Sequence, residues 1–271
     1  MTTQQSWLRS ACFVALLVLP AVALSADLTK NLGEANPDDR TVELFAGIDT
    51  GEIEVELIPK DAKQARLLIK NNTQQPLNVH LPPAFAGIPA LAQVGGGVGG
   101  GGGGGGGNQG IGGGGMMGGG GMMGGGGMFN IAPEQLGQLK VATVCLEHGK
   151  KDPRPGVPYR IVPLKQLTDS PGVEQLLAAL SANKVNQRVA QAAAWHLAND
   201  MSWEELAGKR IEHLNGTSEA WFSRQEIAMG MRAASASLAL ATASDEKGES
   251  EDAEKPTEIE TQLEKVVEGD D

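Results

Sequence analysis

A glycine tract between Gly95 and Gly127 separates two segments that both have the patterning of β-strands. Glycine has no side chain to bury and loses the most conformational entropy on ordering, so the tract is predicted to be a disordered loop. A loop eight times longer than a short hairpin turn costs only about 2 kcal/mol more in closure entropy. The strands on either side are therefore expected to pair despite the insertion.

The β region is predicted over residues 41–162, interrupted by the loop at 95–127. Apolar residues alternate there with polar or charged ones, which is the period of half-buried antiparallel strands. The alternating positions are Val42, Leu44, Ile53, Val55, Leu57, Leu67 and Ile69. Polar turns follow at residues 47–51 and 71–76. Short strands joined by such turns predict a small antiparallel β-sandwich of immunoglobulin-like type, within an α+β fold.

Cys145 lies in the last predicted strand of this region, LKVATVCLEHG. Val141, Val144 and Leu146 favour a buried strand, with Cys145 within it or at its end. Three prolines follow between residues 153 and 158, and each removes an amide donor. Strand pairing is therefore predicted to stop just after Cys145.

The period becomes helical beyond Pro163, and a helical subdomain is predicted over residues 170–243. Helices are expected from Ser170, over 185–199, from the capping box at Ser202–Glu205, and from Thr217 to Ala241. The third is expected to end at Asn215–Gly216. The buried stripe of the fourth is predicted to include Met231 and Leu238.

The two ends of the chain carry signals of their own. An apolar run from Ala11 to Leu24 with small residues after it predicts a signal peptide over residues 1–26 and export to the periplasm, cell surface or medium. No transmembrane span is expected in the mature chain. Residues 244–271 hold twelve acidic residues and three lysines, which predicts a disordered acidic tail. A net charge of -11 argues against nucleic acid as a partner.

Soft-metal binding is one alternative function. The glycine tract repeats a GMMGGG unit, and flexible thioethers outside the cytosol are ligands for Cu(I). Cys145 and His148 have the Cys-x-x-His spacing of two metal ligands, although a structural site needs about four. The candidate metal ligands are Cys145, His148, Met116, Met117, Met122, Met123 and Met128. The competing interpretation is a low-complexity expansion with no cofactor.

Two resemblances rest on short segments. TVCLEHGKKDPRP and QAAAWHLANDMSWEEL resemble exported bacterial proteins of no established function, which supports export and the two-part architecture. Residues 189–195 are also similar to the Thr-Gln-x-Ala-Ile-Trp helix of bacterial surface thioester domains, in which the glutamine condenses with a cysteine on an earlier strand. This second resemblance implies a thioester between Cys145 and Gln191, with Trp195 as a packing residue. Ala190 stands where that motif has threonine.

The sequence thus predicts an exported, non-catalytic protein that binds an unidentified protein or envelope component or has a structural role in the envelope. His148 has no identifiable Asn or Asp to orient it as a base for Cys145, so a cysteine hydrolase is not indicated. The alternatives are a covalent, adhesin-like thioester protein and a copper-binding protein.

Overall fold

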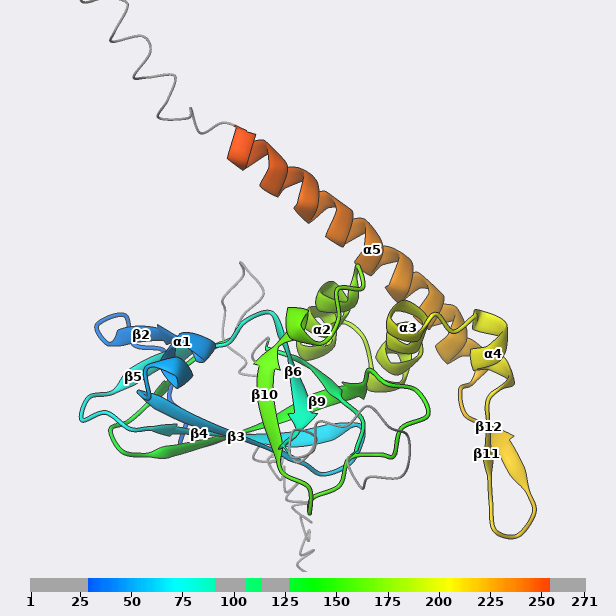
Figure 1. The fold of residues 1–271 in the computed structure, drawn as a ribbon, viewed down its shortest axis with the longest axis horizontal. Coiled ribbons are helices and arrows are strands. Elements are labelled where there is room, and N and C mark those ends of the chain that lie inside the picture. Colours follow the sequence, from blue (N-terminus) through cyan, green and yellow to red (C-terminus); the bar gives the residue numbers. More distant parts are fainter. Residues whose placement is uncertain (1–28, 91–105, 114–126, 254–271) are drawn as a thin grey trace, which may run out of the picture.

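The structure, a computed structural model, describes residues 29–90, 106–113 and 127–253. Six strands form a closed antiparallel barrel (Figure 1). They follow the order β9, β4, β3, β10, β6 and β7, and β7 pairs again with β9. The barrel strands are β3 (Ile53–Pro59), β4 (Gln64–Asn71), β6 (Ala84–Pro89), β7 (Gln109–Gly112), β9 (Leu136–Cys145) and β10 (Tyr159–Pro163). A short strand, β1 (Thr29–Lys30), pairs with the first half of β9.

The mixed α+β class and the antiparallel pairing follow the prediction, but the sheet does not form the expected sandwich. A sandwich keeps two separate sheets face to face, whereas here the pairing of β7 with both β6 and β9 joins the sheet into a ring. The residue that precedes Cys145 on β9, Val144, is paired with Gly110 of β7. The closing strand therefore lies directly beside the cysteine.

The glycine tract is not disordered throughout, because β7 lies inside it. Gly110 and Gly112 face helix α2 (Val173–Ser181), and a Cβ on Gly112 would stand 2.0 Å from the backbone oxygen of Leu177. Strand and helix can approach this closely only where the strand has no side chain. Part of the tract is thus a packed barrel strand. Residues 95–105 and 114–126 of the predicted loop lie outside the described residues.

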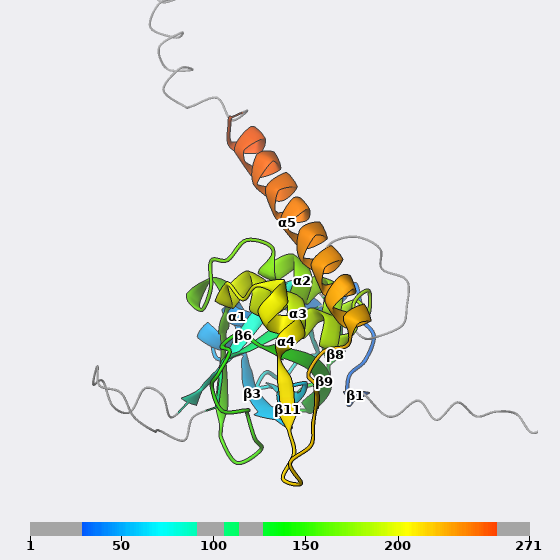
Figure 2. The same ribbon diagram turned by 90° about the vertical axis from the view of Figure 1, so that its right-hand side faces the viewer.

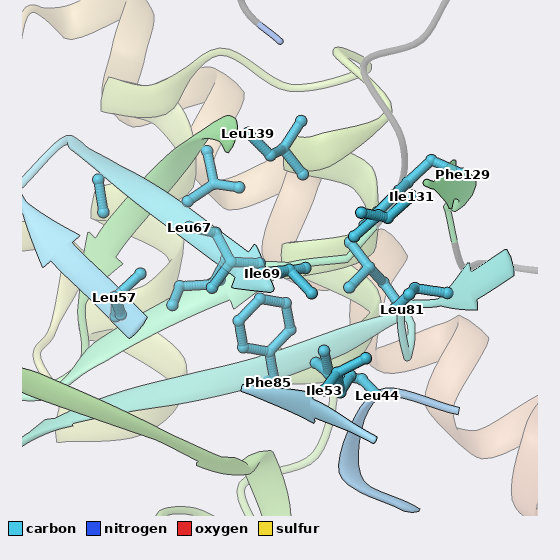
Figure 3. Packing of buried hydrophobic residues seen from close by; sticks show 14 of the residues in the cluster. Leu44, Ile53, Leu57, Leu67, Ile69, Leu81, Phe85, Phe129, Ile131 and Leu139 are labelled. Carbon is cyan, nitrogen blue, oxygen red and sulfur yellow. The ribbon is translucent and has the colours of Figure 1, made fainter. Parts of the chain in front are cut away.

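A separate three-stranded sheet and a short helix cover the interior of the barrel. β2 (Arg40–Glu43) pairs parallel to β5 (Leu77–His80), and β5 pairs antiparallel to β8 (Met128–Ile131). The helix α1 (Leu44–Asp49) replaces the strand and turn expected there. Side chains from the barrel and from this cover form one continuous apolar core (Figure 3), which includes Leu44, Leu57, Leu67, Phe85, Phe129 and Ile131.

Helices α2 and α3 (Gln187–Asn199) lie on the outside of the barrel, over β6, β7 and β9 (Figures 1 and 2). A second apolar core fills the space between them, and Val144, Leu146, Leu177 and Ala193 belong to it. The 3-10 turn η2 (Leu164–Gln166) leads into α2, and α3 follows. The expected helix over 185–199 is confirmed.

The capping box at Ser202 is also confirmed, with both reciprocal hydrogen bonds present at the start of α4 (Trp203–Gly208). The predicted end of that helix is wrong. Residues 210–220 form a hairpin of β11 (Arg210–Glu212) and β12 (Ser218–Ala220), and Asn215–Gly216 is its turn. Gly216 has a φ of 79°, which suits a hairpin turn.

The last helix, α5 (Arg224–Ala253), begins seven residues later than expected and continues into the predicted tail. Its second half extends away from the rest of the molecule (Figures 1 and 2). Met231 and Leu238 are 46% and 38% exposed, so they are not part of its buried stripe, whereas Ala234 is buried. Residues 254–271 of the predicted tail and residues 1–26, the predicted signal peptide, lie outside the described residues. Over the described part of the chain, no helix is both long and apolar enough to cross a membrane.

Candidate functional site

Cys145 is the last residue of β9, as predicted, and it is only 4% exposed. Its side chain falls on the same face of β9 as Leu139 and Val141, which point into the barrel. The sulfur lies 3.1 Å from the backbone oxygen of Glu147, to which the thiol donates a hydrogen bond. The cysteine is therefore held at the rim of the barrel interior.

Gln191, from α3, meets the backbone of Cys145 although 46 residues separate the two in sequence. Gln191 Nε2 donates to the Cys145 carbonyl oxygen at 2.9 Å, and Gln191 Oε1 accepts from the Cys145 amide, also at 2.9 Å. The glutamine is 6% exposed, so these bonds are shielded from water. The structure thus brings together the two residues that the thioester resemblance paired.

Two further amides of α3 act in the same way, and sequence reasoning missed both. Strand β4 ends its pairing with β9 at Thr143, whose amide donates to the Lys63 backbone oxygen. Beyond that point, Gln187 Nε2 donates to the Thr143 carbonyl oxygen at 3.0 Å. Asn199 Nδ2 then donates to the Leu146 oxygen at 3.0 Å, and its Oδ1 accepts from the amide of residue 148 at 3.0 Å.

The side-chain amides of Gln187, Gln191 and Asn199 form a row along the end of β9. They bond to its backbone where a neighbouring strand would otherwise do so. Four residues of helix rise about 6 Å, close to the roughly 6.7 Å that two strand residues span. Gln187 and Gln191 are four apart, and the groups they bond, on Thr143 and Cys145, are two apart. The spacing Gln-x-x-x-Gln, with Asn eight residues further on, is the sequence signal for this arrangement. It gives Gln191 a structural role whether or not it reacts.

A cavity of about 240 Å³ opens beside the cysteine, between the barrel rim, α3 and the hairpin. Its apolar walls are Trp195, Trp221 and Phe222, and Cys145, Gln191 and Asp152 supply polar groups. Another cavity, of about 310 Å³, lies over β3 and β4 and contains no predicted site residue. The cavity beside Cys145 is therefore the candidate binding site.

Lys209 and His148 pack against the tryptophans that line this cavity. The Lys209 ammonium stands 5.3 Å from the ring centre of Trp195 and 5.0 Å from that of Trp221, which is the geometry of cation–π contacts. It also donates to His148 Nε2 at 2.8 Å, which requires that nitrogen to be unprotonated. The imidazole ring meets Trp195 edge-on, at 4.8 Å between centroids.

Burial controls the acid–base behaviour of both residues. Burial raises the pKa of the Cys145 thiol, and the carboxylates of Asp152 and Glu147 add to the rise. Burial also lowers the pKa of His148, and the neighbouring Lys209 ammonium lowers it further. Each residue is thereby held in its neutral form near neutral pH.

Three of the predicted metal ligands, Cys145, His148 and Met128, lie among the described residues. His148 faces Lys209 and Trp195, so it does not converge with Cys145 on a shared ligand position. Within the described ranges, no group of three or more His, Cys, Asp or Glu residues could hold a metal ion. Met128 lies exposed on β8. Met116, Met117, Met122 and Met123 lie outside the described residues.

The fold and site define an α+β protein with a closed antiparallel barrel, a helical layer and a buried Cys145–Gln191 contact where the two meet. Comparison of the chain with protein-family profiles, curated proteins and solved structures finds no match.

Proposed function

We propose that this protein is an exported, non-catalytic binding protein and that its ligand site is the cavity beside Cys145. The observation that carries the proposal is the convergence of three aromatic side chains and several polar groups on one cavity of about 240 Å³. Binding sites are typically concave and mostly apolar, with a few placed polar groups. The partner is a protein or another component of the cell envelope, and the net charge of -11 disfavours nucleic acid.

The test compares two variants for binding to isolated envelope fractions. Trp221→Ala removes a wall of the cavity, whereas Leu214→Ala changes a fully exposed residue in the hairpin loop. Binding that is lost in the first variant and kept in the second supports the cavity as the ligand site. Equal binding by both would place the binding surface elsewhere. Export is tested by sequencing the N-terminus of the protein recovered outside the cytoplasm.

A second candidate function is favoured by the Cys145–Gln191 contact: covalent capture through a thioester. In this reaction the Cys145 sulfur bonds to Cδ of Gln191, the bond from Cδ to Nε2 breaks, and the thiol proton leaves with that nitrogen as ammonia. The Cys145 amide already donates to Gln191 Oε1, where negative charge develops during the attack. A target amine would then open the thioester and become attached to Gln191.

Intact mass of the mature protein, before and after treatment with a thiol alkylator, tests this candidate. Loss of one ammonia without alkylation supports the thioester, and one added alkyl group on the unmodified mass shows a free thiol and rejects it. A doubled mass that disappears on reduction shows a disulfide dimer and also rejects it. Gln191→Ala should restore a free thiol. Its matched control is Gln187→Ala, which removes the neighbouring amide of the row but leaves the thioester intact.

A further inference from the structure

Two buried side-chain atoms in the described part of the chain have no hydrogen-bond partner: Gln109 Oε1 and Trp195 Nε1. Both belong to residues that flank Cys145. Gln109 is the cross-strand partner of Cys145 on β7, and Trp195 lines the cavity with it, one helical turn after Gln191. A buried donor without an acceptor is destabilising, because it has lost its hydrogen bond to water. Two polar atoms beside Cys145 therefore lack hydrogen-bond partners while the thiol is unreacted.

Trp195 cannot turn away to find another acceptor. Its side chain is 6% exposed and its ring contacts three others, Trp221 and Phe222 at 5.9 Å and His148 at 4.8 Å between centroids. The indole N–H is a donor only. Because the Cys145 thiol gives its own hydrogen to the Glu147 oxygen, the lone pairs of the sulfur remain free to accept.

We propose that the Trp195 indole N–H is the donor that activates Cys145, by hydrogen bonding to the sulfur as it becomes a thiolate. Burial alone makes a cysteine inert, and a fixed N–H donor at the sulfur favours the charged, nucleophilic form. Cys145 is thereby a site of covalent modification in the cavity, open to electrophiles small enough to enter it.

The biological use of this activation rests on the second candidate function. During thioester formation, charge develops on the sulfur and on Gln191 Oε1, and each atom has its own donor: the indole N–H for the sulfur and the Cys145 amide for the oxygen. When an amine later opens the thioester, the sulfur leaves as a thiolate, and the same indole N–H stabilises it. The pKa of the thiol is raised overall, because burial outweighs the opposing influence of the Trp195 side chain.

The experiment measures the rate of alkylation by iodoacetamide as a function of pH. It uses the full mature chain with Gln191→Ala, in which the thioester cannot form. Adding Trp195→Phe keeps an aromatic ring but removes the N–H together with the five-membered ring that carries it. We expect the midpoint of the profile to rise and the rate at neutral pH to fall about tenfold, the equivalent of one pKa unit. The matched control is Trp203→Phe, which makes the same change at a tryptophan outside the cavity lining and should leave the profile unchanged. A Trp195→Phe profile that coincides with its parent overturns the proposal.

A second measurement needs no change at Trp195, in case that variant does not fold. In the chain with Gln191→Ala, the indole N–H resonance of Trp195 should shift as the thiol titrates, and Cys145→Ala should abolish the shift. A resonance that ignores the thiol overturns the proposal. The two hypotheses also fail separately. A Trp195 effect without ammonia loss in the parent protein leaves an activated thiol and no thioester, whereas ammonia loss that is equally fast with Trp195→Phe leaves a thioester without this activation.

Discussion

Gly112→Ala tests whether the glycine tract contributes a packed strand to the barrel. The added Cβ would stand 2.0 Å from the Leu177 backbone oxygen and 2.7 Å from Ser181 Cβ, both on α2. Carbon atoms of this kind do not approach closer than 3.0 Å, so strand and helix must separate by about 1 Å. The oxygen belongs to the helix backbone, so it cannot rotate out of the way as a side chain can.

The cost follows from what α2 buries. Its inward leucines, Leu176, Leu177 and Leu180, belong to the core between barrel and helices, and displacing the helix loosens all three. Overpacking of a core typically costs 1–3 kcal/mol, and a clash with backbone falls at the upper end, about 3 kcal/mol. For a protein of this size, that corresponds to a fall in Tm of roughly 6–12 °C.

Two other glycines provide a graded comparison. A Cβ on Gly110 would lie 3.0 Å from the δ carbons of Leu177, which can rotate, so Gly110→Ala should cost about 1 kcal/mol. A Cβ on Gly156 would have nothing within 4 Å, and its substitution should change stability by less than about 0.5 kcal/mol. Thermal and urea unfolding followed by tryptophan fluorescence measure all three. If Gly112→Ala is as stable as Gly156→Ala, β7 does not pack against α2 and the barrel is not closed as described.

Three further predictions concern the rest of the chain. Because the pKa of His148 is lowered on folding, the unfolded chain takes up the proton first as the pH falls, so the free energy of unfolding should decline below about pH 6.5, the ordinary pKa of histidine. His148→Asn should flatten that part of a urea-unfolding series, and unchanged slopes would contradict the assignment. Ser202→Ala removes the cap of α4 and should cost about 1 kcal/mol in the same assay, whereas no loss would mean that the capping box is not needed. If the alternative of copper binding holds, copper should bind more weakly to a chain without residues 114–126, which carry four of the five candidate methionine ligands and exclude β7. Equal affinity in both would reject the methionine-rich segment as the copper site.

Some of the candidate site could be predicted from the sequence because its signals are local. The strand ending at Cys145 follows from its apolar residues and the prolines after it, and the helix carrying Gln191 follows from its apolar period. Their contact was suggested only by resemblance to another family. The apolar pattern of the strand does not show which residues of the helix it will face, and the pattern of the helix does not show this for the strand. The row of amide hydrogen bonds between them could therefore not be predicted from the sequence.

The sequence alone determined the elements whose stabilising interactions lie within a few residues of one another: the alternating strands β3, β4 and β9, and the capping box of α4. Tertiary structure decided the rest. Strand β7 consists mostly of residues with no preference for a strand, and its conformation comes from pairing with β6 and β9 and from its close approach to α2. The ring closure that turns the expected sandwich into a barrel depends on that strand. The cavity beside Cys145 likewise exists only once the barrel, α3 and the hairpin are assembled, because each contributes a wall that has no local signal in the sequence.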